Sequence, residues 1–439
     1  MIILANIKVL YDGKSGASAS VHRTVDLWID GDRIHSLVPS GRPLPTGDAV
    51  SVVDCSSYTV APGLVDCHGH VVHLGLSDED EVRINGANQL LYVEKILHTS
   101  LVDGGVTTIR DVGGATHAMK KMVDDGLVIG PRLVIAICML STTGGHADFR
   151  GHDRCHSSIS RLWPEGPGRP SSIVDGPWEC RKRVREIAAC GADLIKLCTS
   201  PGVASPSDQL ENQDFTPEEV SAICSEAAAR GLRVAAHAHS RAGIELAIKN
   251  GVSDLQHISF MDERLVDMAA KHGCTVTPTS WVLQTLSDSD GLSPFVREKA
   301  KRVAEVHAKA VQYARAGGLK ILGGTDPVLP GMHGRNYVEM SALMNDGLTN
   351  LEAWYAMTGL AAREVGLSDT GAIEPGFRAD LLICRDDVIA NPRLFGRDTL
   401  VEVIKEGVGH RGGLSALPQR RFADNARALW PADSQPTSA

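Results

Sequence analysis

The middle of the chain carries eight short apolar runs, and segments with helical periodicity lie between most of them. Runs of this kind are typical of strands buried on both faces, as in a parallel sheet covered by helices. Eight such units predict an α/β fold, a (β/α)8 TIM barrel over residues 59–375. A doubly wound open sheet is the alternative, but no glycine-rich G-x-G-x-x-G sequence occurs among these eight units. The runs are YTVAPGLVDCH, GVTTIRDVGG, PRLVIAICML, ADLIKLCTS, LRVAAHAHS, SDLQHISF, CTVTPTS and LKILGGTD.

The segments that flank this region read as short paired strands. Residues 1–58 contain alternating, β-branched stretches between Asp-Gly and Pro-Gly turns, and GAIEPGFRADLLICRDDV and TLVEVIKEGVGH have the same character. We therefore expect residues 1–58 and 376–439 to form one small discontinuous β-sandwich domain beside the barrel. Within the barrel region, TPEEVSAICSEAAARG predicts a helix with Thr216 as its cap and a capping box to Glu219.

Charge and cysteine content exclude several classes of partner and location. The formal net charge of −9 argues against binding nucleic acid or an anionic membrane. No run of about 18 apolar residues predicts a membrane span, and the first residues lack the features of a secretory signal. The ten cysteines include no C-x-x-C pair, which indicates reduced thiols. We expect a cytoplasmic protein.

Polar side chains stand at the ends of the predicted strands, where the chemistry of a (β/α)8 barrel collects. The His68–Gly69–His70 spacing matters because side chains two apart on a strand point to the same side and can bind one cation. Asp66 faces the same way, either to orient a ligand ring or to bond the backbone, and Cys67 is expected to face the barrel wall. The full set is His68, His70, Lys196, His237, His239, His257 and Asp326.

These motifs resemble those of the amidohydrolase superfamily, binuclear type. The resemblance rests on PGLVDCHGH, LIKL, AAHAHS, LQHIS and GGTD, and it covers nearly the whole chain. Three further segments, STTGGHAD, SPGVASPSDQ and MHGRNYVEM, resemble a narrower branch. That branch contains imidazolonepropionase-related amidohydrolases, prolidase-like and Xaa-Arg carboxypeptidases, and ochratoxinase.

The resemblance implies a site of two divalent metal ions. Lys196 would be carboxylated by carbon dioxide and bridge the ions as a carbamate. His237, twenty residues before His257, would be the ligand of its strand, which leaves His239 facing the substrate or supporting the ligands, a purely structural role being the alternative. Imidazole and carboxylate ligands without thiolate suit zinc, and also manganese, cobalt or nickel. The implied ligands are His68, His70, Lys196, His237, His257 and Asp326.

The expected chemistry is hydrolysis of an amide bond. A hydroxide that bridges the two ions would attack the scissile carbonyl. Asp326 would act as general base and acid, taking a proton from the water and passing it to the leaving amine.

Specificity is expected to come from loops after the strands. His146, His239, His333 and Arg335 are candidates for contact with the substrate. Arg150, Arg154 and Arg335 are the candidate partners of a substrate carboxylate. We expect His152 and His156 to be surface residues, the alternative being a zinc site that they form with Cys155. We expect His73 to have a structural role.

The sequence thus predicts a carboxypeptidase- or prolidase-like amidohydrolase, a homo-oligomer acting on small amides. Dipeptides, N-acyl amino acids and ochratoxin-type aryl amides are the expected substrates. The same metal site could instead hydrolyse a carbamate, urea, lactone or organophosphate ester. A catalytically silent scaffold barrel is the remote alternative.

Overall fold

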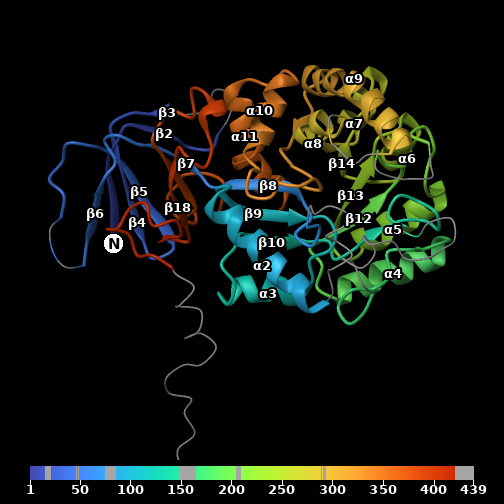
Figure 1. Cartoon of the computed structure of the whole chain (residues 1–439), viewed down its shortest axis with the longest axis horizontal. Helices are drawn as coiled ribbons and strands as arrows, with labels where there is room; N and C mark the ends of the chain where they lie inside the picture. Colours follow the sequence, from blue (N-terminus) through green and yellow to red (C-terminus); the bar gives the residue numbers. More distant parts are fainter. Residues whose placement is uncertain are drawn as a thin grey trace, which may run out of the picture.

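A computed structural model describes residues 1–14, 21–45, 47, 49–74, 86–148, 150, 165–203, 209–287, 289 and 293–420 of the chain. Two sheets built from the chain ends lie at one end of the molecule, and the parallel strands with their helices make up the rest (Figure 1). Within the described ranges, no helix combines the length and apolar character that a membrane span requires.

The sheets at the chain ends combine N-terminal and C-terminal strands. One has the order β5-β4-β1-β6, and the other has the order β19-β18-β17-β7-β2-β3. Their N-terminal strands are β1 (Ile2–Ile7), β2 (Val9–Tyr11), β3 (Val21–His22), β4 (Val25–Asp30), β5 (Arg33–Pro39), β6 (Ser51–Asp54) and β7 (Thr59–Pro62). Their C-terminal strands are β17 (Leu381–Cys384), β18 (Leu400–Lys405) and β19 (Val408–Gly409), with the short helix η3 (Pro392–Leu394) between β17 and β18. Blue and red strands therefore lie side by side in Figure 1.

The parallel strands match the eight apolar runs, with two of the runs divided. They form one sheet of order β10-β9-β8 and another of order β11-β12-β13-β14-β15-β16. The strands are β8 (Leu64–Gly69), β9 (Val106–Asp111), β10 (Arg132–Ile135), β11 (Met139–Leu140), β12 (Leu194–Cys198), β13 (Arg233–Ala238), β14 (Asp254–His257), β15 (Thr275–Thr277) and β16 (Lys320–Ile321).

Both divisions have a local cause. The run YTVAPGLVDCH separates into β7, which pairs with β17, and β8, which pairs with β9. Gly63 lies between them, where a Cβ atom would overlap the side chain of Thr107. The run PRLVIAICML separates into β10 and β11 around Ile137, whose φ of 70° belongs to the left-handed region and interrupts an extended strand.

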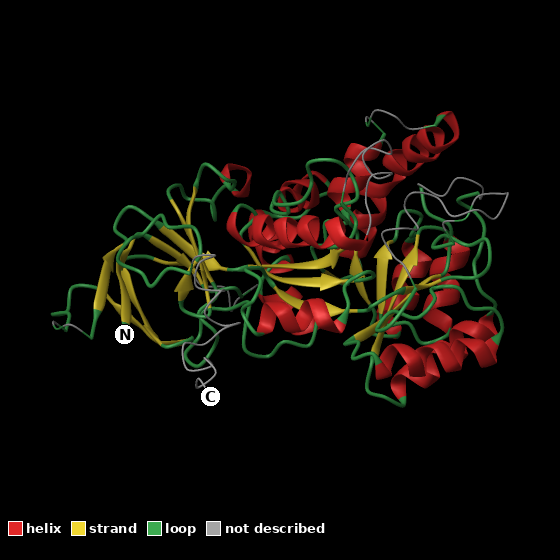
Figure 2. Cartoon of the chain, turned by 60° about the horizontal axis from the view of Figure 1, so that its bottom comes forward, coloured by secondary structure: helices red, strands yellow, loops and turns green. Residues whose placement is uncertain are grey.

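Helices cover the outside of the parallel strands (Figure 2). The capping box predicted at Thr216 is confirmed, since its side chain accepts a hydrogen bond from the Glu219 amide and its own amide donates to Glu219. The helices are α2 (Gly86–Val102), α3 (His117–Asp124), α4 (Pro177–Ala189), α5 (Pro217–Ala228), α6 (Arg241–Lys249), α7 (Glu263–Lys271), α8 (Ser280–Leu286), α9 (Pro294–Ala316), α10 (Val338–Asn345), α11 (Asn350–Ala356) and α12 (Gly359–Glu364).

The two parallel sheets touch one another through hydrogen bonds and one buried ion pair. The amide of Cys67 donates to Gly323 O (3.0 Å) and the amide of Asp193 donates to Ile135 O (2.8 Å). Arg110 of β9 lies 2.5 Å from Asp254 of β14, and both side chains are buried. The ion pair shows that the interiors of the two sheets face each other.

The side chain of Cys67 packs as predicted against the wall of this region. It is fully buried in a cluster with Val65, Leu322 and Leu360, and burial raises the pKa of its thiol to about 12. Cys67 is therefore kept as a neutral thiol that is unsuited to binding a metal ion.

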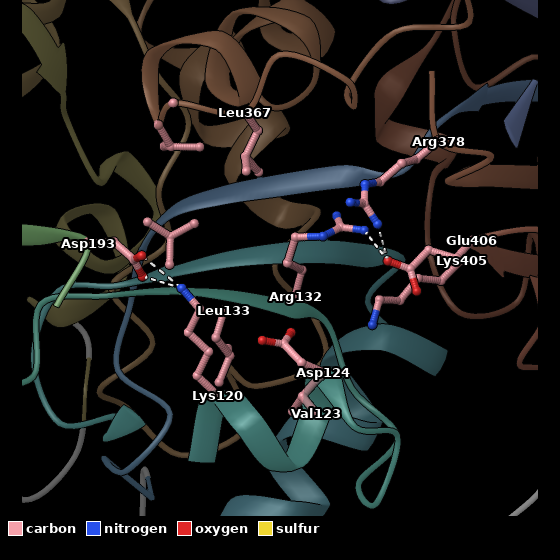
Figure 3. A pocket seen from close by; sticks show the side chains of 13 residues that line it. Lys120, Val123, Asp124, Arg132, Leu133, Asp193, Leu367, Arg378, Lys405 and Glu406 are labelled. Atoms are coloured by element: carbon pink, nitrogen blue, oxygen red, sulfur yellow. Dashed lines mark hydrogen bonds and ion pairs between the residues drawn. The ribbon is translucent and has the colours of Figure 1, made fainter. Parts of the chain in front are cut away.

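A cavity of about 660 Å³ lies where α3, β10 and the end of β18 meet (Figure 3). Five of its charged side chains are paired with one another, because Lys120 pairs with Asp193 (2.7 Å) and Glu406 lies 2.7 Å from both Arg132 and Arg378. None of the predicted site residues lines this cavity. The ion pair between Glu406 and Arg132 joins the end of β18 to β10 and so links the terminal sheets to the parallel strands.

Candidate metal centre

The predicted ligands converge at the carboxyl ends of the parallel strands. Two groups form there, with the ligand atoms of each group within 4.8 Å of one another. The first consists of His68, His70 and Asp326, and the second of His237, His239 and His257. The rings of His68 and His257 lie 4.9 Å apart, so the two groups adjoin.

The first group is held together around one carboxylate oxygen. Oδ1 of Asp326 lies 3.5 Å from Nε2 of His68 and 3.5 Å from Nε2 of His70. The Asp326 amide donates to His68 O (2.8 Å), which fixes the turn after β16 against the end of β8. Burial raises the pKa of the Asp326 carboxyl. The carboxyl can therefore hold a proton under conditions in which an exposed aspartate would be ionised.

Lys196 extends from β12 into the same interior. Its Nζ lies 3.4 Å from Gln256 Oε1, and its side chain is fully buried. Burial lowers the pKa of the ammonium, and its positive charge lowers the pKa values of His68, His70, His237 and His257. A neutral amine is the form that can react with carbon dioxide.

The histidines fit a cation in charge and in hydrogen bonding. Burial is the main cause that lowers the pKa of each ring, which favours the neutral imidazole that binds metal ions. Among the described residues, buried Nδ1 of His68 and Nε2 of His237 have no hydrogen-bond partner. Because an unpaired buried polar atom is costly, these two atoms favour a site built for a ligand.

Three rings are oriented by bonds at Nδ1. His70 Nδ1 lies 2.9 Å from Gly113 O, His257 Nδ1 lies 2.8 Å from Thr279 Oγ1, and His239 Nδ1 lies 2.8 Å from Ser259 Oγ. A carbonyl oxygen can only accept, so His70 donates from Nδ1 and carries its lone pair on Nε2. This arrangement resembles the supporting bonds around metal-binding histidines in general.

Asp66 does not contact a ligand ring in the described contacts; it fixes the backbone instead. It accepts hydrogen bonds from the His68 amide (3.0 Å), from Thr325 Oγ1 (2.5 Å) and amide (3.0 Å), and from Asn336 Nδ2 (2.7 Å). The backbone alternative left open by the sequence is therefore the one observed. Asp66 ties β8 to the segment that carries Asp326.

Two ligand candidates have left-handed backbones. The φ angles of His257 and Asp326 are 70° and 46°. Such angles are costly for residues other than glycine, and they persist where the surrounding contacts impose them. Here they turn both side chains inward at the ends of β14 and β16.

His146 lies over the second group. Its ring stacks on that of His237 with centroids 4.0 Å apart and 21° between the planes. Gly202 lies against the same ring, because a Cβ atom there would overlap His146. Burial lowers the pKa of His146 to about 3, so the ring stays neutral. This position agrees with a contact to substrate.

The remaining described candidates have contacts outside the two groups of ligand candidates. His333 donates from Nε2 to His73 O (2.6 Å). The exposed Arg335 stacks on Trp281 with its guanidinium carbon 5.8 Å from the ring centre. Arg150 forms an ion pair of 2.6 Å with Asp148. His73 is buried, in keeping with a structural role. His152, Arg154, Cys155 and His156 lie outside the described residues.

Sequence reasoning missed several buried polar residues near the centre. Gln256 and Thr279 contact predicted ligands directly, and Arg110 and Asp254 form the ion pair described above. Lys299 of α9 is buried, and its charge is one of the causes that lower the pKa values of His146 and His239. A lysine in the apolar stripe of a helix, at spacings of four and eight from Val303 and His307, was the available signal.

Comparisons with known proteins agree with this geometry. The model of the Amidohydrolase family matches residues 59–408. Ochratoxinase from Aspergillus niger is 29% identical over 426 residues, covering 92% of this chain and 85% of that protein. An imidazolonepropionase from Mesorhizobium japonicum is 27% identical over 402 residues, covering 86% and 90%.

The fold has a similar match among solved structures. A prolidase crystallised with N-methylphosphonate-L-proline superimposes with a TM-score of 0.84 at 28% identity, over 93% of this chain and 99% of the prolidase. Similarity therefore extends through both the terminal sheets and the parallel strands.

Proposed function

Because the chain belongs to the amidohydrolase family and is a hydrolase of carbon–nitrogen bonds, we propose that it removes a C-terminal amino acid from a small amide. Dipeptides, N-acyl amino acids and aryl amides of the ochratoxin type are the proposed substrates. The observation that carries this proposal is the pair of adjoining groups, which combine five buried histidines with the half-buried Asp326, together with the fully buried Lys196.

The proposed ligands are His68, His70, Lys196, His237, His257 and Asp326, with Lys196 carboxylated and zinc as the metal. When bound, two such ions would make a water molecule acidic at neutral pH and polarise the scissile carbonyl. The unpaired ring nitrogens of His68 and His237 support this set. Asp66 and the Asp326 amide fix the ligands of β8 relative to Asp326.

Asp326 is the proposed group that moves a proton. Its carboxylate oxygen would receive a proton from the attacking water and deliver it to the leaving nitrogen, which must be protonated before the bond breaks. The raised pKa of Asp326 supports this role, because the carboxyl can retain the proton between the two steps.

A substrate carboxylate needs a cation near the stacked rings of His146 and His237. We propose Lys299 for this role, with Arg335 at the mouth as the outer candidate. Burial strengthens the attraction between Lys299 and an anion relative to an exposed side chain. His146, His239 and His333 would contact the rest of the substrate.

Several predictions from the sequence enter the proposal unchanged. We propose that the two parallel sheets close into one (β/α)8 barrel over residues 59–375, supported by the bonds that cross between them. The bridge between Arg33 and Arg378 and the bond from the Ile34 amide to Phe377 O (2.8 Å) support one domain from residues 1–58 and 376–439, although β7 extends its sheet to Pro62. Homo-oligomerisation and a cytoplasmic location stay predictions.

The test is release of free amino acid, followed by mass spectrometry, from a mixed panel with zinc-loaded protein. The panel holds Xaa-Pro and Xaa-Arg dipeptides, N-acyl amino acids, an ochratoxin-type amide, and aryl carbamates and ureas. We expect release that the Asp326→Asn variant loses by a factor of about 10² to 10⁴. Turnover of carbamates or ureas alone would overturn the amino-acid proposal.

A further inference from the structure

A chain of buried polar side chains runs from His239 away from the metal centre into the helices. His239 Nδ1 lies 2.8 Å from Ser259 Oγ, which lies 3.4 Å from His307 Nδ1 on α9. His307 Nε2 lies 3.4 Å from Ser280 Oγ at the start of α8 and 3.8 Å from Asp346 Oδ2 at the end of α10. All five side chains are buried.

Asp346, at the end of this series of polar side chains, determines which ring nitrogen of His307 carries the proton. An ionised carboxylate only accepts hydrogen bonds, so Ser280, whose side chain is hydrogen-bonded to Asp346, donates to it and leaves its own Oγ to accept from His307. The N–H of His307 is therefore favoured on Nε2, facing Ser280 and Asp346, which leaves a lone pair on Nδ1. Ser259 then donates to His307 and accepts from His239, because a hydroxyl has only one proton to donate.

We propose that His307 is a positioning residue that, through Ser259, holds the proton of His239 on Nδ1 and turns its Nε2 lone pair toward the reaction site. His239 then accepts a hydrogen bond or binds a cation at Nε2, and it does not donate to a carbonyl oxygen. The inference deepens the proposed function and rests on it only for the place of His239 beside the substrate.

The lengths of these contacts indicate that the series of side chains serves to orient the His239 ring. The bond at 2.8 Å fixes the His239 ring, whereas the two links at 3.4 Å are at the long end for hydrogen bonds. Backbone contacts hold the same geometry, since the Phe260 amide donates to His239 O (3.1 Å) and keeps Ser259 beside His239.

A double-mutant cycle on zinc-loaded full-length protein tests the link. Ser259→Ala and His307→Phe each remove one step, and each is expected to lower kcat about tenfold or more with KM and metal content little changed. If both act through His239, the double variant loses no more than the more damaged single variant. Losses that multiply would overturn the proposal, because independent structural damage adds in free energy.

A spectroscopic measurement tests the same point without activity. Long-range ¹H–¹⁵N correlation spectra of ¹⁵N-histidine-labelled, zinc-loaded protein report which ring nitrogen of His239 carries the proton, with His239→Gln used for assignment. We expect protonated Nδ1 in the native protein and a changed or mixed signal in His307→Phe. An unchanged signal would overturn the proposal.

Two further variants keep the result interpretable. Val303→Ala removes buried volume from the same face of α9 without changing any of the five polar side chains between His239 and Asp346. It should leave the His239 signal unchanged. His307→Gln replaces His307→Phe if the latter does not fold, with the same expected signal change. If the substrate panel shows no turnover, the proposed function fails, and the spectra still decide the proton position.

Discussion

Nζ of Lys196 lies 3.4 Å from Oε1 of Gln256, and both side chains are fully buried. Gln256 in turn donates from Nε2 to Asp254 (2.9 Å), which is paired with Arg110. The amine is therefore fixed beside the neutral side chain of Gln256, and the negative charge of Asp254 behind it is compensated by Arg110. Burial, the main cause that lowers the pKa of this amine, favours its neutral form.

We expect Lys196 to be required for binding the second metal ion. Wild-type protein reconstituted with zinc and bicarbonate should hold two ions per chain, and Lys196→Met should hold at most one. Elemental analysis measures the ions, and ¹³C spectra of protein treated with ¹³C-bicarbonate report a carbamate. Two ions retained by Lys196→Met would show that no carboxylated lysine is needed.

Gly202→Ala should impair catalysis by moving one ring. The added methyl group would overlap His146 and displace it from its stack on His237. We expect kcat/KM to fall about tenfold to a hundredfold, because small displacements of positioned groups are costly, with metal content preserved. Gly166→Ala is the matched control, since a Cβ atom at Gly166 meets nothing within 4 Å. Equal activity of the two variants would show that the position of His146 has no role in catalysis.

Lys299→Gln should distinguish substrates by their charge. We expect KM for a substrate with a free carboxylate to rise about tenfold or more, with kcat less affected, because the lost interaction is made in both ground and transition states. KM for the same substrate with its carboxylate amidated should change little. Arg335→Gln is measured in parallel; if it alone shows this difference, the outer cation binds the carboxylate.

Arg110→Met should destabilise the fold strongly. It leaves Asp254 buried without its ion-pair partner, and breaking a buried pair in this way costs about 3–5 kcal/mol. Urea unfolding of the metal-free protein measures the loss. The control is Lys121→Met, which breaks an exposed pair with Asp125 and should cost less than about 1 kcal/mol.

The metal-free protein should lose stability as the pH falls from about 6.5 to about 4. Burial lowers the pKa of His307 to about 4, while an unfolded histidine titrates near 6.5. Between these values the unfolded state binds more protons than the folded state, so the free energy of unfolding rises with pH.

Removal of His307 should flatten this dependence. We expect His307→Gln to reduce the slope between pH 4 and 6.5 by up to about 1.4 kcal/mol per pH unit. Val303→Ala should lower stability at every pH and keep the wild-type slope. A slope that is unaffected by His307→Gln would mean that this ring is protonated in the folded state.

The sequence by itself determined the strands and the ligand candidates at their ends. Apolar runs bounded by polar residues depend on local burial, and the spacing of His68 and His70 follows from the two-residue period of a strand. The capping box at Thr216 is equally local, because both of its bonds join residues three apart.

Only the tertiary structure decided how those candidates are supported. Asp66 bonds Thr325 and Asn336, about 260 to 270 positions away in the chain, and His239 reaches His307 through Ser259. The division of YTVAPGLVDCH between two sheets likewise depended on β17, far along the chain. Such contacts carry no periodic signal, because they depend on which strand ends and helix faces meet once the chain has folded.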